Sequence, residues 1–153
     1  LMAIWAADCA GRVLPFFERA YPMDSRPRKA IVECRRWVRT GAFRMADIRK
    51  ASLAAHAAAR KAKENSAARF AARAAGQAVA AAHIAQHAYG SAYYALKAVA
   101  AASPARAGII ITRDRLWQSR RLPKRLRQEM LERLLIQKSG GNIAVKIRKG
   151  KDF

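Results

Sequence analysis

Apolar residues recur through most of the chain at the three- and four-residue spacing of an α-helix. The spacing predicts helices over residues 2–20, 25–41 and 45–62, separated by proline, glycine and polar residues. An alanine-rich stretch over residues 66–102 follows, and it is longer than a typical globular helix, so we expect a break near residues 84–86. The pattern as a whole predicts an all-α protein in which helices pack on helices.

Proline and small residues add detail to the predicted helices. Pro15 lies inside the first helix and is expected to kink it or to end its first half, because proline removes a backbone hydrogen bond. Ala72, Gly76 and Ala80 form a stripe of small residues on the alanine-rich stretch. This stripe predicts that a neighbouring helix lies at the short end of the usual interaxial range of about 8–10 Å.

The C-terminal part of the chain is less regular. Residues 103–108 are predicted to be a linker, and residues 109–111, three isoleucines, have brief strand character before helical spacing returns over residues 113–121. A last helix is predicted to begin at Leu122-Pro123 and to continue to about residue 135.

The sequence changes character after the run Ser139-Gly140-Gly141. Alternating Ile143, Val145 and Ile147 would suit a short strand if a partner edge were present. Because the segment is rich in lysine and arginine and offers little to pack, a basic tail is the favoured interpretation. The predicted organisation is one bundle of six or seven helices over residues 1–137, with an alanine-rich core, and a basic tail over residues 138–153.

Charge is the strongest compositional signal. The 153 residues include 31 Lys and Arg against 10 Asp and Glu, a formal net charge of +21. A surface this basic attracts polyanions, so nucleic acid and acidic proteins are candidate partners, and a merely solvated surface is the alternative. Trp117 lies among the basic residues and is available for stacking on a base. The candidate polyanion-binding residues are Arg35, Arg36, Arg39, Arg120, Arg121, Lys124, Arg125, Lys146, Arg148, Lys149 and Lys151.

The two cysteines, Cys9 and Cys34, form no CxxC pair and fall on partly apolar helix faces. Buried, reduced thiols are expected, which favours a cytoplasmic protein. The first residues lack the pattern of a signal peptide. Residues 74–96 carry no Lys, Arg, Asp or Glu, but glutamines, histidines and glycines interrupt them, so a buried helix pair is expected and no membrane association.

Four polar residues interrupt apolar patterns and are candidates for a shared pocket: Asp8, His56, His83 and His87. On a continuous helix His83 and His87 would share a face. Three interpretations are open, namely a hydrogen-bonded core network, a small-molecule or catalytic pocket, and a site for zinc or a similar metal. The core network, with no cofactor, is favoured. P-loop, GxGxxG and GxSxG motifs are absent from the sequence, and nothing in it specifies an enzyme.

Several segments resemble a bacterial and archaeal family labelled putative immunity proteins, the immunity-protein-five-like domain. The similar segments are residues 5–10 (WAADCA), 13–18 (VLPFFE), 26–31 (RPRKAI), 54–60 (AAHAAAR), 75–80 (AGQAVA), 94–98 (YALKA) and 117–135, with His83 and His87. The resemblance covers roughly residues 1–137. It implies an α-helical fold, a role in protecting cells from a toxin, and membership of Asp8 and the three histidines in a shared polar set.

Two features depart from that family pattern, namely the strong positive charge and the basic C-terminal segment. Because an inhibitor is expected to complement the charge of its target, a toxin bound by this chain should be acidic. The expected function is therefore non-catalytic binding of an acidic protein partner. The alternatives are a nucleic-acid- or ribosome-binding protein and a small metal-dependent or pocket enzyme that uses the histidines. Whether the chain forms a homo-oligomer stays open.

Overall fold

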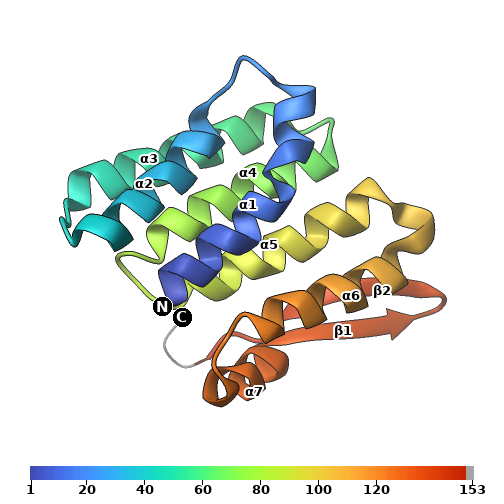
Figure 1. Cartoon of the computed structure of the whole chain (residues 1–153). Helices are drawn as coiled ribbons and strands as arrows, with labels where there is room; N and C mark the ends of the chain where they lie inside the picture. The colour runs from blue at the N-terminus through green and yellow to red at the C-terminus, as the bar shows by residue number, and fades with distance from the viewer. Residues whose placement is uncertain (151–153) are drawn as a thin grey trace.

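A computed structural model describes residues 1–150, and in this range the chain is all-α apart from one small hairpin (Figure 1). The prediction of an all-α bundle is confirmed. The helices are α1 (Met2–Ala20), α2 (Arg26–Thr40), α3 (Met45–Lys61), α4 (Ser66–Ala80), α5 (His87–Ala102), the 3₁₀ helix η1 (Pro104–Arg106), α6 (Ala107–Arg120) and α7 (Lys124–Arg133). The strands are β1 (Leu134–Ser139) and β2 (Asn142–Ile147).

Local sequence signals explain where the first helices begin and end. Pro27 lies in the first turn of α2, where a missing N–H costs no hydrogen bond, and Gly41 ends this helix in the left-handed conformation with φ of 67°. The Asn65 side chain accepts a hydrogen bond from the backbone N–H of Ala68 at 3.0 Å and thereby caps α4. The expectation that Pro15 ends the first half of α1 is wrong, because the helix continues to Ala20.

The predicted break in the alanine-rich stretch is confirmed. Helix α4 ends at Ala80 and α5 begins at His87. Between them, tight turns form in which the His83 N–H donates to the Ala80 carbonyl at 3.0 Å and the His87 N–H to that of Ile84. The chain therefore reverses direction, and α4 and α5 pack side by side (Figure 1).

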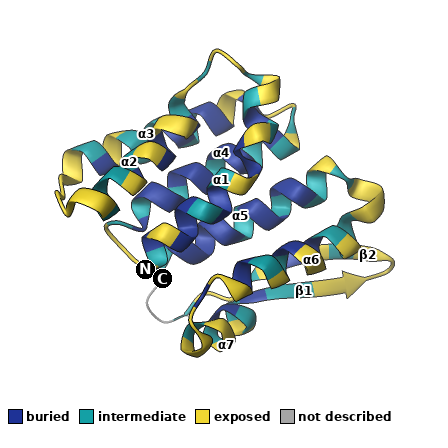
Figure 2. Cartoon of the chain, viewed as in Figure 1, coloured by how far each residue is buried: buried dark blue, intermediate teal, exposed yellow. Residues whose placement is uncertain are grey.

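Helix α4 lies at the centre of the bundle and contacts α1, α2, α3 and α5. Eight of its 15 residues are buried (Figure 2), and six of these are alanines. Small side chains let the neighbouring helices come close. Gly76 shows the effect of the predicted small-residue stripe, because a Cβ at this position would lie 2.7 Å from Nε2 of His56 on α3.

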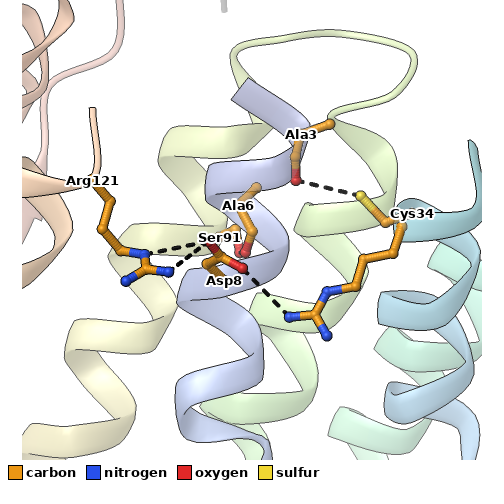
Figure 3. Close-up of polar contacts among 7 residues, drawn as sticks. Ala3, Ala6, Asp8, Cys34, Ser91 and Arg121 are labelled. Carbon is orange, nitrogen blue, oxygen red and sulfur yellow. Dashed lines mark hydrogen bonds and ion pairs between the residues drawn. The ribbon is translucent and has the colours of Figure 1, made fainter. Parts of the chain in front are cut away.

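A few buried polar groups link helices that are far apart in sequence. The Ser91 hydroxyl on α5 lies 3.0 Å from the carbonyl of Ala6, which Figure 3 draws beside it. It also lies 2.9 Å from the Ala74 carbonyl, so one side chain joins α5 to α1 and α4. The Trp5 indole N–H donates to the Gln118 carbonyl at 2.9 Å and ties α1 to α6. This last bond fixes α6 against α1, and the site described below lies between these two helices and α2.

The predicted linker and strand before α6 are corrected. Residues 104–106 form a 3₁₀ helix, and α6 begins at Ala107 and includes all three isoleucines of residues 109–111. Of these three residues only Ile111 is fully buried, and Ile109 is exposed. A single buried isoleucine is consistent with one face of a helix, whereas a strand run would need a partner edge.

The C-terminal expectations are also corrected. The last helix stops at Arg133, and Leu134 and Leu135 belong to β1. Residues 142–147, expected to belong to a basic tail, form β2 and pair antiparallel with β1. Gly140 and Gly141 both have positive φ, as a two-residue hairpin turn requires.

The hairpin is held against the bundle by apolar and polar contacts. Val145 of β2 is buried, and β2 contacts α5 and α6. The Arg115 guanidinium of α6 donates to the carbonyls of Leu131 and Leu134, both at 2.7 Å. Burial lowers the pKa of Arg115.

Within residues 1–150, no individual helix has the length and apolar character needed to cross a membrane. Only α5 taken together with residues 104–120 passes a test of length and composition, and these two segments are bent by 112°.

Because Gly76 lies against His56, the effect of Gly76→Ala on stability is expected to have opposite signs in the wild type and in a His56→Ala variant. Gly76→Ala is expected to lower the free energy of unfolding by about 1 kcal/mol, because the crowding cost exceeds the gain in helix propensity. In a His56→Ala background the same change is expected to raise it, because the ring that the added methyl group would crowd is gone. Urea denaturation of the four proteins measures both effects, and an equal effect in the two backgrounds would contradict the predicted contact.

Candidate functional site

A cavity of about 370 Å³ opens between α1, α2 and the C-terminal end of α6. We call it the arginine groove. The ionic residues that line it are Arg12, Arg28, Arg35, Arg121, Asp8 and Glu18, and Trp117 also contributes. Its floor is apolar and includes Leu14 and Ile31. Four guanidinium groups against two carboxylates leave an excess of positive charge in a hollow of the size that small ligands or side chains of a partner occupy.

Asp8 joins the two sides of the groove. Its Oδ2 accepts hydrogen bonds from Nη2 and Nε of Arg121 at 3.1 and 3.3 Å, as the dashed lines in Figure 3 show. Its Oδ1 lies 3.5 Å from Nη2 of Arg35 on α2. One carboxylate on α1 therefore serves two guanidinium groups that come from opposite sides of that helix.

Arg12 is held by a buried carboxylate. Its Nε and Nη2 donate to the two carboxylate oxygens of Asp114 on α6, at 3.2 and 3.1 Å. Asp114 is buried, with 4% of its surface exposed, and Nε of Arg113 lies 3.4 Å from it. A buried carboxylate needs such partners, so Arg12 and Asp114 form a fixed cross-link between α1 and α6.

Trp117 completes this end of the groove. The guanidinium groups of Arg12 and Arg121 lie over its ring at 4.4 and 4.7 Å from the ring centre. Such stacking orients a guanidinium and leaves its N–H groups at the edge able to donate. The ring of Trp117, predicted from the sequence to be available for stacking on a nucleic acid base, already has these two cationic partners.

The other residues predicted to bind polyanions are dispersed. Arg120 lies with Arg113 and Trp117 in a hollow next to the groove. Arg36 pairs with Glu33 on the same helix, and Arg39 is exposed near the end of α2.

The remaining members of that set lie on α7 and the hairpin. All of those described are exposed: Lys124, Arg125, Lys146, Arg148 and Lys149. Lys151 falls outside the residues that the structure describes. Of the eleven predicted residues the groove thus brings together Arg35 and Arg121, with Arg120 beside it.

The histidines occupy a different part of the bundle. Nδ1 of His56 lies 3.0 Å from Nη1 of Arg73, and since arginine cannot accept, the His56 ring is neutral with Nδ1 as acceptor. Nδ1 of His87 lies 2.7 Å from the Gln77 side-chain oxygen. His83 is exposed in the turn before α5, whereas His56 and His87 are half-buried, so His83 does not belong to a core network.

The histidines and Asp8 do not form one cluster. His83 and His87 do not share a helix face, because the chain turns between them. Asp8 bonds to Arg35 and Arg121 instead of a histidine. Among residues 1–150, no three or more His, Cys, Asp or Glu side chains are arranged to hold a metal ion.

The cysteines behave as expected from the sequence. Cys9 and Cys34 are buried and are not joined in a disulfide. Burial raises the pKa of both thiols, that of Cys34 to about 12. The Cys34 Sγ lies 3.5 Å from the Ala3 carbonyl, as the dashed line in Figure 3 shows, and 3.3 Å from that of Ala78. Both thiols are therefore unreactive parts of the core.

Sequence reasoning missed Arg12, Arg28 and Glu18 of the groove, and also Asp114, the partner of Arg12. Two signals were present. Arg12 follows Asp8 by four residues and so lies on the same face of α1. Asp114 is a single acidic residue within a strongly basic segment, which indicates a carboxylate that binds several arginines.

His56 predicts how stability depends on pH. Burial, together with the charges of Arg73 and Arg60, lowers its pKa from 6.5 to about 4. The folded protein therefore binds fewer protons than the unfolded chain between these values, and the free energy of unfolding is expected to fall as the pH decreases through that window. The contribution of the neutral ring is fully present above pH 6.5. Urea denaturation at several pH values measures how steeply the free energy of unfolding changes with pH.

The matched variant for this experiment is His56→Gln, whose amide oxygen still accepts from Arg73 but does not titrate. It is expected to show a shallower decrease of stability between pH of about 6.5 and 5, above the range in which carboxylates titrate. Equal slopes for the variant and the wild type would show that His56 does not titrate as its burial implies.

Comparison with known proteins identifies the family of the chain. A family model described as "Imm-5 like putative immunity protein" matches residues 1–125. This range contains α1 to α6 and the whole arginine groove. No curated protein and no solved structure matches the chain. The match confirms the resemblance seen in the sequence, and the chain belongs to the Imm-5-like family of putative immunity proteins.

Proposed function

We propose that this chain is a non-catalytic, cofactor-independent protein of the cytoplasm that neutralises a toxin by binding an acidic surface of it in the arginine groove. The family is labelled as one of immunity proteins, which act on a protein partner. The observation that carries the proposal is the groove itself, where four arginines and two acids line a cavity of about 370 Å³.

The charge balance of the chain supports an acidic partner. The formal net charge of +21 speeds the encounter with a negatively charged protein and opposes binding to a basic one. Inside the groove the arginines are held by Asp8, Glu18 and Asp114, so they keep defined positions before a partner arrives. Donors that are already positioned lose little conformational entropy on binding, which favours specific recognition.

The arginines over the Trp117 ring favour a protein rather than a nucleic acid as the partner that binds in the groove. Single-stranded nucleic acids are bound largely by stacking of bases on aromatic rings. In this chain Arg12 and Arg121 already lie over the Trp117 ring. The groove therefore offers guanidinium edges, which match carboxylates, and not a free aromatic surface.

A capture experiment tests the proposed function. Wild-type chain is immobilised beside the double variant Arg35→Gln, Arg121→Gln and a control, Arg39→Gln, Arg125→Gln, that loses the same charge at exposed sites outside the groove. Lysate of the source cells is passed over each, and retained proteins are identified and expressed. We expect an acidic protein on the wild type and the control, and binding weaker by about tenfold or more on the groove variant.

The captured protein must also behave as a toxin. Its expression is expected to arrest growth, and co-expression of the wild type or the control is expected to restore growth where the groove variant does not. Capture that does not depend on the groove, a partner that leaves growth unaffected, or retention of nucleic acid alone would contradict the proposal. The ratio of absorbance at 260 to 280 nm, before and after a wash in about 1 M salt, detects the last outcome.

A further inference from the structure

The arginines of the groove differ in how completely their donors are used. Arg12 donates through Nε and Nη2 to Asp114, and Arg28 donates through the same two atoms to Glu18, both at 2.6 Å. Arg121 directs Nε and Nη2 at Asp8. In each of these three side chains the Nε–Nη2 edge, one of the two edges through which a guanidinium can bind a carboxylate with parallel hydrogen bonds, is occupied.

Arg35 is the exception. Among the described residues, its guanidinium makes one side-chain hydrogen bond, from Nη2 to Asp8 at the long distance of 3.5 Å. Its side chain is 56% exposed. Nε and Nη1 therefore remain able to donate to a ligand that enters the groove, and Asp8 restrains the guanidinium without saturating it.

Gly11 explains how Arg35 reaches this position. The residue lies in the middle of α1, where glycine costs about 1 kcal/mol relative to alanine. A Cβ on Gly11 would lie 3.2 Å from Nη2 of Arg35, closer than an ordinary van der Waals contact. The absence of a side chain thus lets the Arg35 guanidinium lie against α1, at the edge of the same cavity that Gly11 lines.

We propose that Arg35, placed by Gly11 and Asp8, is the anchor of an oxyanion site that takes a carboxylate of an acidic side chain of the partner. The proposal rests on the function proposed above. Arg121 adds positive charge on the far side of Asp8, and Trp117 and Arg12 close that end of the groove. Asp8 itself lies between Arg35 and Arg121, so it is an anion with which a ligand carboxylate would compete for the Arg35 guanidinium.

Titration calorimetry on the purified chain tests the site without a natural partner. The probes are a hexaglutamate peptide and inorganic phosphate, in a buffer near physiological ionic strength so that unspecific attraction is screened. Arg35→Gln is compared with Arg39→Gln, which removes the same charge from the same helix outside the groove. We expect Arg35→Gln to weaken hexaglutamate binding by about fivefold or more, and Arg39→Gln to change it by less than about twofold.

A charge-neutral variant separates the site from overall charge. Gly11→Leu leaves the net charge unchanged and suits a helix, but its side chain fills the groove and displaces Arg35. It is expected to weaken hexaglutamate binding as much as Arg35→Gln, while far-ultraviolet circular dichroism shows an intact helical fold. Gly11→Ala, with its single methyl group against the tip of a flexible side chain, is expected to have a smaller effect.

Two results would overturn the proposal. If Arg35→Gln and Arg39→Gln weaken hexaglutamate binding equally, the affinity follows total charge and no site exists at Arg35. If the binding of phosphate depends on Arg35 and Gly11 but the binding of hexaglutamate does not, the site takes a free anion and not an acidic side chain. Neither result involves the captured partner, so failure here and failure of the proposed function are told apart.

Discussion

The close packing of α1, α4 and α5 is the constraint on which the rest of the structure depends. Small side chains at their contact let Ser91 lie within 3.0 Å of the carbonyls of both Ala6 and Ala74. A larger residue there would force the helices apart. Because α1 is fixed on this frame, its outer face meets α2 on one side and the end of α6 on the other. The arginine groove is therefore a consequence of the alanine-rich core.

The scarcity of acidic residues shapes the chemistry of the groove. The chain has 31 Lys and Arg residues and 10 Asp and Glu residues, so a carboxylate near the groove can have more than one arginine partner. Asp8 serves Arg35 and Arg121, and Asp114 serves Arg12 and Arg113. Shared carboxylates hold guanidinium groups in place without neutralising them. Donors that are positioned but not saturated suit the binding of an acidic partner, as in the function proposed above.

The helices up to α5 were predictable because periodicity, Pro27, Gly41 and the excessive length of the alanine-rich stretch are local signals. The hairpin was not, because Leu134 is stabilised as a strand residue by Ile147, across a turn of two glycines. The predicted histidine cluster does not form, because the chain turns between His83 and His87 and their side chains do not share a helix face. The groove was only half predictable, since Arg12 and Asp114 are 102 residues apart and no local pattern joins them.

Crystals of the chain grown with selenate, an oxyanion whose anomalous scattering marks its position, test the central claim most directly. If Arg35 anchors an oxyanion site, the strongest anomalous peak lies in the arginine groove, about 3 Å from Nε or Nη1 of Arg35 and beside Gly11. Selenate ordered only on the exposed lysines and arginines of α7 and the hairpin, with the groove empty, would contradict it.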